Sequence, residues 1–450
     1  MKQESMGMSM KEMMVWSSFA TILAVISMLC LASGAQENTP DSWYQKGLKL
    51  MEDEAYEDAL IAFNKAIELD PENASIWLGK GDTLVRMGDY NESQKIYEKS
   101  LEMADKTTRA NPQDAKGWFV QGELLQKQSK YDEAIKAFDK AIEADPKYAE
   151  AWYRKGAVLY FGAYFEAWVQ PKQDIVKTFE ESLEALNKAI ELNPEYGVAW
   201  SEKGYVLSSL ADPNIDHVLS SPANLNAGLE RYNESLEAFD RAIELIPAEE
   251  SKNSLALAWD GKALALVGMG NMLKDMNRQE EASERYDEAA NACDKAIELD
   301  PNFTGLEARL TKAGILSELG RYNESLATYD EAIKSMPADY AIFNASIMAD
   351  KGGVLIKIGE YKEALTTIDA ALQIDPTNPI AWENKGDALN GTGRYDEAIN
   401  AYDRAIELSP ELGTLKADSW QSKGDALLAS GRQTEAAAAF STAKELGYKE

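Results

Sequence analysis

One helix-turn-helix pattern recurs about ten times along this chain, at a spacing close to 34 residues. It is clearest in a copy marked by Trp382, Gly386, Tyr395, Ala398 and Pro410. The small residues let two antiparallel helices approach closely, and the proline ends the second helix because it cannot continue it. A unit of this size buries its apolar face only against its neighbours. The repetition therefore decides the fold.

With the tryptophan numbered position 4 of the repeat, position 4 is also tryptophan in seven other copies and is replaced by Arg309 and Met348 in two. The tryptophans are Trp43, Trp77, Trp118, Trp152, Trp200, Trp259, Trp382 and Trp420. This pattern resembles the tetratricopeptide repeat (TPR), and its copies look like those of long arrays common in methanogenic archaea. The resemblance implies an all-α, right-handed superhelical solenoid of about ten TPR units over residues 43–450, with one continuous core. Lysine recurs at position 7, which indicates a structural role with its ammonium near acidic neighbours.

Three copies are longer than the others. The steps from position 8 to position 20 number 26 in the fourth and sixth copies and 31 in the fifth, against 12 elsewhere. Fourteen extra residues make about four helical turns, so we expect the fourth and sixth copies to extend both helices by about two turns each. The fifth copy inserts 212–224, whose prolines predict a loop carrying the only histidine, His217.

The extension of the fourth copy carries an aromatic stripe, Tyr160, Phe161, Tyr164, Phe165 and Trp168. This spacing places the rings on one face of a helix. Two interpretations stay open: the stripe is covered by the extended second helix of the same copy, or it is an exposed patch that docks a partner or a membrane surface.

The segment before the repeats has a different character. Residues 1–35 combine a charged start, an uncharged apolar stretch within 13–32 and small residues suited to cleavage, which predicts a signal peptide or membrane anchor. Residues 36–42 are a short linker. We therefore expect an extracytoplasmic protein, secreted or anchored in the cytoplasmic membrane through residues 13–32, with cleavage and retention both open.

Seven Asn-x-Ser/Thr sequons are candidate glycosylation sites. They lie at Asn73, Asn91, Asn233, Asn302, Asn323, Asn344 and Asn390. Three of them share one repeat position, where Tyr-Asn-Glu-Ser stands in place of Tyr-Asp-Glu-Ala. The alternative is that asparagine suits the first turn of a helix as aspartate does, and that serine is one more small residue.

The formal net charge is −30, which argues against nucleic-acid binding through phosphate contacts. The acidic residues belong to the repeat itself and are typical of a solvated face that keeps a long chain soluble. A preference for cationic partners and adaptation to high salt would give the same composition.

In arrays that resemble this one, ligands lie along a concave groove lined by the first helix of each unit, with positions 2, 5, 9 and 12 pointing inward. Position 5 is apolar early in the chain and acidic later. The groove residues predicted on this basis are Tyr44, Leu78, Phe119, Tyr153, Asp260 and Glu383. They would suit a protein or peptide segment with apolar anchors and basic residues. The lysine and asparagine with which some relatives hold a terminal carboxylate are absent, and the residues could equally form only the inner wall.

Catalysis finds little support in the sequence, which has one histidine and lacks a glycine-rich phosphate loop and any His-x-x-x-His spacing. No cofactor or metal is expected. The sequence predicts a non-catalytic, exported or membrane-tethered scaffold that binds partner segments in its groove. The alternatives are a glycosylated structural component of the cell envelope and, if the leader is not used, an intracellular TPR adaptor.

Overall fold

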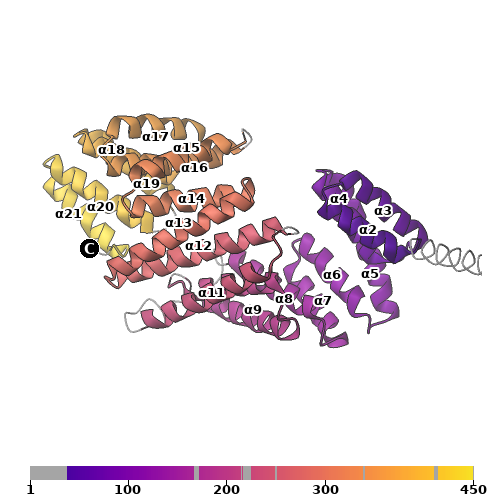
Figure 1. The fold of residues 1–450 in the computed structure, drawn as a ribbon. Helices are drawn as coiled ribbons and strands as arrows, with labels where there is room; N and C mark the ends of the chain where they lie inside the picture. The colour runs from indigo at the N-terminus through magenta and orange to yellow at the C-terminus, as the bar shows by residue number, and fades with distance from the viewer. Residues whose placement is uncertain are drawn as a thin grey trace, which may run out of the picture. The chain divides into compact units, whose positions relative to one another are not determined.

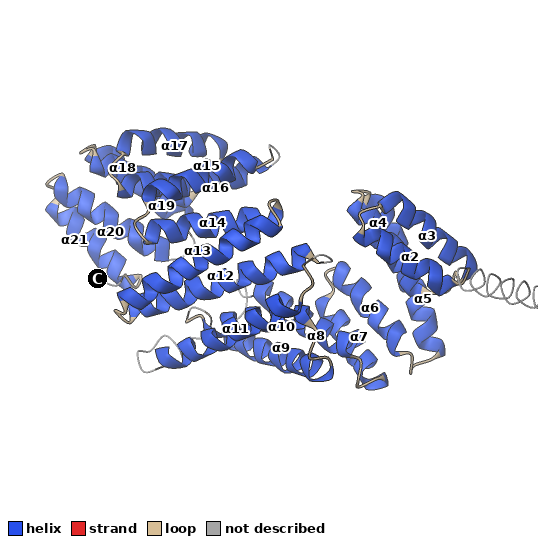
Figure 2. Ribbon diagram, viewed as in Figure 1, coloured by secondary structure: helices blue, strands red, loops and turns tan. Residues whose placement is uncertain are grey.

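The computed structural model describes residues 38–166, 172–213, 215, 224–248, 251–337, 340–409 and 414–448. All regular secondary structure in these ranges is α-helical apart from one 3-10 residue, Tyr340, and the helices are joined by short loops (Figure 2). The helices form ten consecutive pairs, one pair for each predicted repeat (Figure 1). We call the first helix of a pair helix A and the second helix B.

Helices A contain positions 1 to 13 of the repeat in most copies. They are α2 (Pro40–Glu52), α4 (Ala74–Arg86), α6 (Ala115–Lys127), α8 (Ala149–Glu166), α10 (Gly197–Ala211), α12 (Lys252–Asp275), α14 (Phe303–Glu318), α16 (Ala341–Lys357), α18 (Pro379–Gly391) and α20 (Thr414–Ala429). Helices B are α3 (Tyr56–Leu69), α5 (Tyr90–Ala110), α7 (Tyr131–Ala144), α9 (Lys172–Leu192), α11 (Leu225–Leu245), α13 (Gln279–Leu299), α15 (Tyr322–Ser335), α17 (Tyr361–Ile374), α19 (Tyr395–Leu408) and α21 (Gln433–Glu445).

The small residue at position 8 lies directly against the ring at position 24 of the same repeat. A Cβ added to Gly386 would lie 2.5 Å from Cε1 of Tyr402, and one added to Gly81 would lie 2.5 Å from Cε1 of Tyr97. These contacts are too short for any side chain, so the glycine is what lets helix B reach helix A. The ring also enters the next repeat, because a Cβ on Gly79 would meet Phe63 of the preceding copy at 2.7 Å.

The residue at position 4 holds the connection from the preceding repeat. The indole Nε1 of Trp77 donates to the carbonyl of Pro71 at 2.9 Å, and Trp118, Trp152 and Trp382 make the same bond to Pro112, Pro146 and Pro376. In the seventh repeat, Nη1 of Arg309 donates to the carbonyl of Pro301 at 3.0 Å. Arginine thus replaces tryptophan there without losing the hydrogen bond.

The ammonium of the lysine at position 7 lies near acidic neighbours, as predicted, and the structure shows in addition that it joins successive repeats. Its ammonium lies over the tryptophan of its own helix, 5.2 Å from the ring centroid for Lys385 and Trp382. It also pairs with an aspartate at position 25 of the preceding repeat, at 2.7 Å for Lys385 and Asp369. The same ion pair joins Lys155 to Asp139, Lys262 to Asp240, Lys312 to Asp294, Lys351 to Asp330 and Lys423 to Asp403. Repeat four has Asn187 at position 25, and burial lowers the pKa of Lys203 in the following repeat.

The structure confirms that the predicted copies are long and shows two further extended helices, α11 and α5. Repeats four and six extend both helices, with α8, α9, α12 and α13 spanning 18, 21, 24 and 21 residues. In repeat five, α11 begins at Leu225, before Tyr232, where helix B of an ordinary repeat would start. Most of the predicted loop 212–224, with His217, lies outside the described residues. Repeat two was predicted to be ordinary, which was wrong, because α5 is 21 residues long where α7 has 14.

Part of the aromatic stripe of repeat four is covered by helix B. Tyr160 packs against the fully buried Phe179 of α9, with ring centroids 5.4 Å apart. Phe161 meets the ring of Tyr131 at 5.8 Å but stays 44% exposed. The side chains of Tyr164 and Phe165, and all of Trp168, lie outside the described residues.

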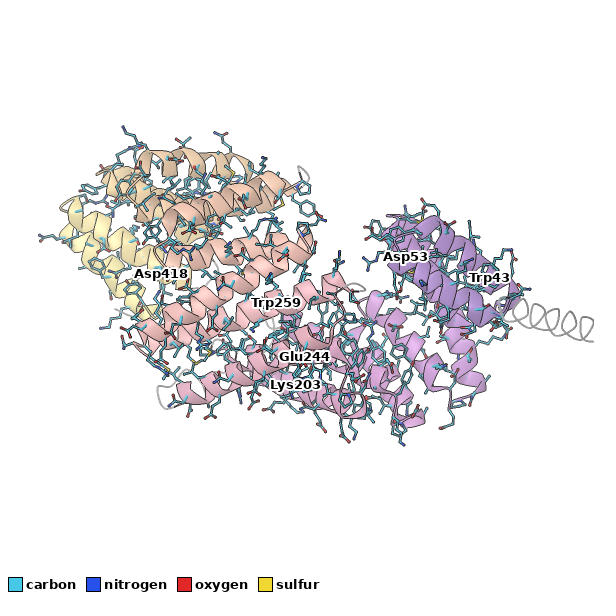
Figure 3. All side chains as sticks on the ribbon, viewed as in Figure 1. Trp43, Asp53, Lys203, Glu244, Trp259 and Asp418 are labelled. Carbon is cyan, nitrogen blue, oxygen red and sulfur yellow. The ribbon has the colours of Figure 1, made fainter. Side chains whose placement is uncertain are left out.

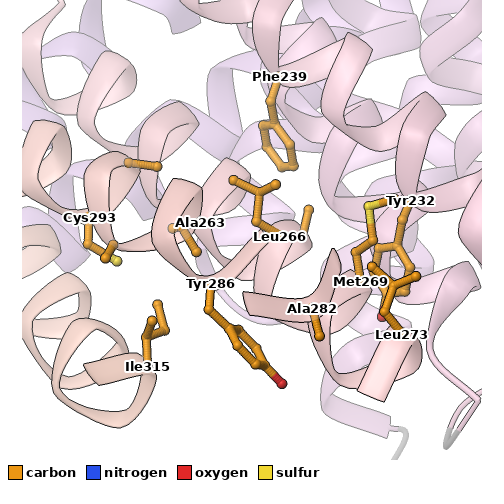
Figure 4. Close-up of a cluster of buried hydrophobic side chains, with 14 of the residues drawn as sticks. Tyr232, Phe239, Ala263, Leu266, Met269, Leu273, Ala282, Tyr286, Cys293 and Ile315 are labelled. Atoms are coloured by element: carbon orange, nitrogen blue, oxygen red, sulfur yellow. The ribbon is translucent and has the colours of Figure 1, made fainter. Parts of the chain in front are cut away.

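The described helices belong to two compact bodies. The N-terminal body holds the residues up to Gln170 together with Lys177–Pro194, and the C-terminal body holds Pro171–Val176 and everything from Glu195. The single continuous array from residue 43 onward stays a prediction. A large core in the C-terminal body packs Phe239, Leu266, Tyr286 and the buried Cys293 together (Figure 4). Among the described helices, none combines the length and apolarity required to cross a bilayer, and the predicted leader lies outside them.

Candidate protein-interaction surface

The residues predicted to line the groove at position 5 do not all reach the surface. Leu78 is 7% exposed and packs in a core cluster with Tyr97 and Leu124. Asp260 is 4% exposed. These two side chains are therefore buried between helices, because position 5 faces the neighbouring helices as well as the predicted groove.

Four of the predicted groove residues are partly exposed. Tyr44 packs on Phe63 with centroids 5.9 Å apart, and Phe119 packs on Phe138 and Tyr148 at 5.8 and 5.1 Å. Tyr153 lies beneath the guanidinium of Arg154, and Glu383 accepts a hydrogen bond from Oγ of Ser419 at 3.1 Å. A contact of these four residues with a partner remains a prediction.

In the C-terminal body, residues from three successive helices A surround a pocket of about 390 Å³. Position 9 contributes Gly314, Gly353 and Asp387, and position 2 contributes Ile380. Position 12 contributes Ser317 and Ile356, so three of the four predicted inward positions meet here. We call the surface formed by positions 2, 9 and 12 of successive helices A the A-helix face.

Carboxyl groups on α16, α18 and α20 make this part of the A-helix face acidic. Loss of hydration raises the pKa of Asp350 to about 6. Loss of hydration, with smaller contributions from Asp387 and Asp418, raises the pKa of Glu383 to about 8 (Asp418 is labelled in Figure 3). Burial also raises the pKa of Asp387, which accepts a 2.7 Å hydrogen bond from the hydroxyl of Tyr402. Because Asp387 and Asp418 disfavour the charged form of Glu383, a cation placed beside these carboxyl groups would relieve their repulsion.

A second pocket, of about 730 Å³, lies in the N-terminal body. Tyr44 of α2, Ile76 of α4 and Val120 of α6 line it together with Asp41 and Asp114. Tyr44 is therefore a predicted groove residue that the structure places in a pocket lining. The mixture of apolar and acidic groups is the combination expected for segments with apolar and basic side chains.

The candidate glycosylation sites differ in exposure. Asn73, Asn91, Asn233, Asn302 and Asn323 are exposed, whereas Asn344 and Asn390 are half-buried. The side chain of Asn73 caps α4 by accepting from the backbone N–H of Ser75 at 3.1 Å. The sequon serines Ser235 and Ser325 are buried and donate to the position-8 carbonyls of Gly204 and Ala313, each at 2.7 Å. Serine at position 20 therefore has a packing role of its own, as in Ser182, which belongs to no sequon and bonds Gly156.

Sequence reasoning missed one group of residues on this surface. Glu307, Tyr340 and Phe343 line a further pocket with Leu306 and Met336, although none was named as a candidate. Glu307 occupies position 2, an inward position, so a signal for it was present. No group of three or more metal-ligating side chains occurs in the part of the chain that the structure describes.

Comparison with known proteins agrees with the repeat pattern. Three models described as "Tetratricopeptide repeat" match residues 72–147, 281–346 and 349–412, and one described as "TPR repeat" matches 47–88, together about half of the chain. No curated protein matches the sequence. The chain is an all-α repeat protein and belongs to the tetratricopeptide repeat family. Proteins of this class bind protein partners, and the repeats assign this chain to the protein-interaction scaffolds.

The solved structures that match this chain share little sequence with it. MamA from Desulfovibrio magneticus RS-1 is 22% identical over 39% of this chain and 94% of its own, with a TM-score of 0.30. Yeast Tom70 is 15% identical over 91% of this chain and 92% of its own, with a TM-score of 0.35. The Cut9-Hcn1 hetero-tetramer of the APC/C is 12% identical over 91% of this chain and 87% of its own, with a TM-score of 0.38.

Proposed function

We propose that this protein is a non-catalytic scaffold that binds segments of partner proteins on its A-helix face. The observation that supports this most is the pocket among α14, α16 and α18, which is built from the inward positions of three successive repeats. Side chains recur there at the repeat spacing, so an extended segment or a helix can make the same kind of contact several times.

We further propose that the bound segments combine apolar anchors with basic residues. Ile380 is 43% exposed at the rim of the pocket, beside Asp350 and Asp387. An apolar side chain would be desolvated against Ile380, and a lysine or arginine would be attracted to the carboxylates. An acidic segment would be repelled by the same groups.

Gly314 offers a direct test, because a Cβ added to it meets no atom within 4 Å. Gly314→Trp should fill the pocket without disturbing the helix. Random peptides displayed on phage would be selected against the full chain, and the selected peptides titrated against both proteins. We expect Gly314→Trp to weaken their binding at least about tenfold, which corresponds to about 1.4 kcal/mol.

The matched control places the same indole on helix B. Glu331 of α15 is exposed and lies outside the pocket lining, so Glu331→Trp should leave the affinity unchanged. Peptides that bind the wild type and Gly314→Trp equally would refute the A-helix face as the binding surface. Failure to select any peptide would count against the scaffold itself.

We propose that the repeats act outside the cytoplasm, either released or held at the membrane by residues 13–32, with glycans on exposed sequons such as Asn91, Asn233 and Asn323. The intact mass of the protein from its native host tests both parts, since a mass lacking residues 1–35 and carrying added sugar is expected. An unprocessed, unmodified mass from the soluble cytoplasm would support an intracellular adaptor. Exposed glycans with no peptide binding would support the structural component of the envelope.

A further inference from the structure

A buried carboxyl group in repeat six makes no contact that neutralises it. Asp260 of α12 is 4% exposed, and its Oδ1 is buried without a hydrogen-bond partner. Within the described part of the chain it forms no ion pair. A buried carboxyl group without a hydrogen-bond partner costs stability, so a ligand that neutralises it would be bound favourably.

A second carboxyl group lies within electrostatic range of the first. Burial is the larger cause of the raised pKa of Asp260, and the negative charge of Glu307 on α14 raises that pKa further. Glu307 is exposed and has no ion-pair partner among the described residues. The two occupy position 5 of repeat six and position 2 of repeat seven, and Glu383 and Asp418 hold the same positions in repeats nine and ten. A carboxyl pair at this register is therefore a recurrent feature of the face.

Glu307 also lines an apolar pocket of about 400 Å³. Leu306, Met336, Pro337, Tyr340 and Phe343 form most of its wall. Tyr340 is 60% exposed and Phe343 is 44% exposed, so both rings are accessible to a partner. Of the two carboxyl groups, Glu307 therefore stands at the edge of an apolar cavity, and Asp260 lies behind it within electrostatic range.

We propose that Asp260 and Glu307 bind the cationic side chain of a partner segment whose neighbouring apolar side chain fills the pocket of Met336, Tyr340 and Phe343. The occupant is a short basic and apolar peptide segment, selected by charge complementarity and by the shape of the pocket. This assignment rests on the proposed scaffold function and names one site and the chemistry it accepts. The guanidinium of arginine suits it because its planar donors can reach both carboxylates at once.

The test uses a fluorescent peptide, capped at both ends, that carries one arginine and one phenylalanine separated by a single glycine within a Gly-Ser sequence. Its partner peptide has citrulline, the neutral analogue of arginine. Fluorescence anisotropy with the full chain should show citrulline binding about tenfold or more weakly, because one charge-assisted contact is lost.

Variants then assign the preference to the named residues. Asp260→Asn and Glu307→Gln should each bind the arginine and citrulline peptides with similar affinity. Glu298→Gln removes the same charge from an exposed ion pair with Lys295 on α13 and should keep the full preference. Phe343→Ser should lose affinity for phenylalanine relative to a peptide with serine in its place, yet keep the preference for arginine.

A pH series gives a readout that mere destabilisation would not produce. Ionisable groups facing Asp260 are Glu307 on α14 and the thiol of Cys293 on α13, whose own pKa is raised by burial and by Asp260. Binding of the arginine peptide should strengthen between about pH 6 and about pH 8, as Asp260 ionises, and Asp260→Asn should lose this trend. Circular dichroism of each variant confirms that it folds.

Equal affinity for arginine and citrulline, or a preference that survives in Asp260→Asn, would overturn the proposal. Peptides that bind elsewhere in a Gly314-dependent manner would then leave the scaffold function standing. Dimerisation of the free protein by sedimentation, abolished by Phe343→Ser, would also overturn it, since a second copy would be the occupant of the pocket.

Discussion

Two glycines that look alike in the sequence have opposite surroundings. Gly386 at position 8 faces the ring of the buried Tyr402, whereas Gly314 at position 9 faces open space. One position separates them in the repeat, and that step turns a residue from the contact with helix B toward the A-helix face.

Alanine substitutions at these two glycines should shift stability in opposite directions. Gly386→Ala should cost about 1 to 3 kcal/mol because Tyr402 must move out of its rotamer or the helices must separate. Gly314→Ala should stabilise the fold by about 0.5 to 1 kcal/mol, since alanine loses less backbone entropy in a helix. Urea unfolding of the three proteins measures both. A Gly314→Ala variant as unstable as Gly386→Ala would contradict the assignment of position 9 to the surface.

The buried Asp260 should make stability depend on pH. Its pKa, about 7 in the folded protein, lies above the ordinary value, so the folded state binds the proton more tightly than the unfolded state does. The penalty for burial is therefore absent below about pH 4, grows as the pH rises and is complete above about pH 7. Asp260→Asn removes it, and should be more stable than the wild type by about 2 to 4 kcal/mol at about pH 8 and nearly equal at about pH 4. Thermal unfolding of the wild type and Asp260→Asn at the two pH values measures this. A stability difference between the two proteins that is the same at both pH values would contradict the burial penalty.

At the scale of the element, the repeat spacing predicted the helix pairs and the extensions of repeats four and six. It did so because positions 4, 8, 20 and 24 face each other across one helix pair, so their spacing reports helix length. The long α5 was missed although Trp77 and Trp118 are 41 residues apart, because the extra residues follow position 27 and leave the marked positions unchanged. The early start of α11 was missed because the prolines of the insertion hid it; Leu229 and Tyr232 there pack in the core of the C-terminal body.

The candidate site was less predictable than the helices. Position 5 was named as the binding position, but Leu78 and Asp260 show that it is shared between packing and the surface. Position 2 is exposed at Glu307, Ile380 and Asp418, whereas position 9 is half-buried in most copies. The pocket of Met336, Tyr340 and Phe343 depends on the connection before α16, which is one residue longer than the connections before α4, α6, α8 and α10.

The lysine and aspartate pairs between repeats should stabilise the fold modestly. Asp403 of α19 pairs with Lys423 of α20 at 2.5 Å, and the lysine side chain is only 16% exposed. Asp403→Asn should therefore cost about 0.5 to 1 kcal/mol, and the cost should fall in high salt. Asp396→Asn on the same helix is the control, because its contact with Arg432 is 3.7 Å long and the side chain is 89% exposed. Equal losses in the two variants by chemical denaturation would contradict a specific role for position 7.

At the scale of the whole molecule, the net charge of −30 should govern how partners arrive. A basic segment is attracted before contact, so its association rate should fall on the order of tenfold when the salt rises from about 20 mM to about 500 mM, with a smaller change in dissociation. Stopped-flow measurements with the arginine peptide determine both rates. An association rate that does not change with salt would mean that the acidic residues serve solubility alone.

The most direct test of the account is to locate a bound segment. A peptide selected against the full chain would carry a photoreactive benzophenone, and mass spectrometry would identify the residues to which it cross-links. The account predicts cross-links to positions 2, 9 and 12 of helices A, among them Gly353 and Ile380, that disappear in Gly314→Trp. Cross-links confined to the outer faces of helices B, unchanged in that variant, would contradict it.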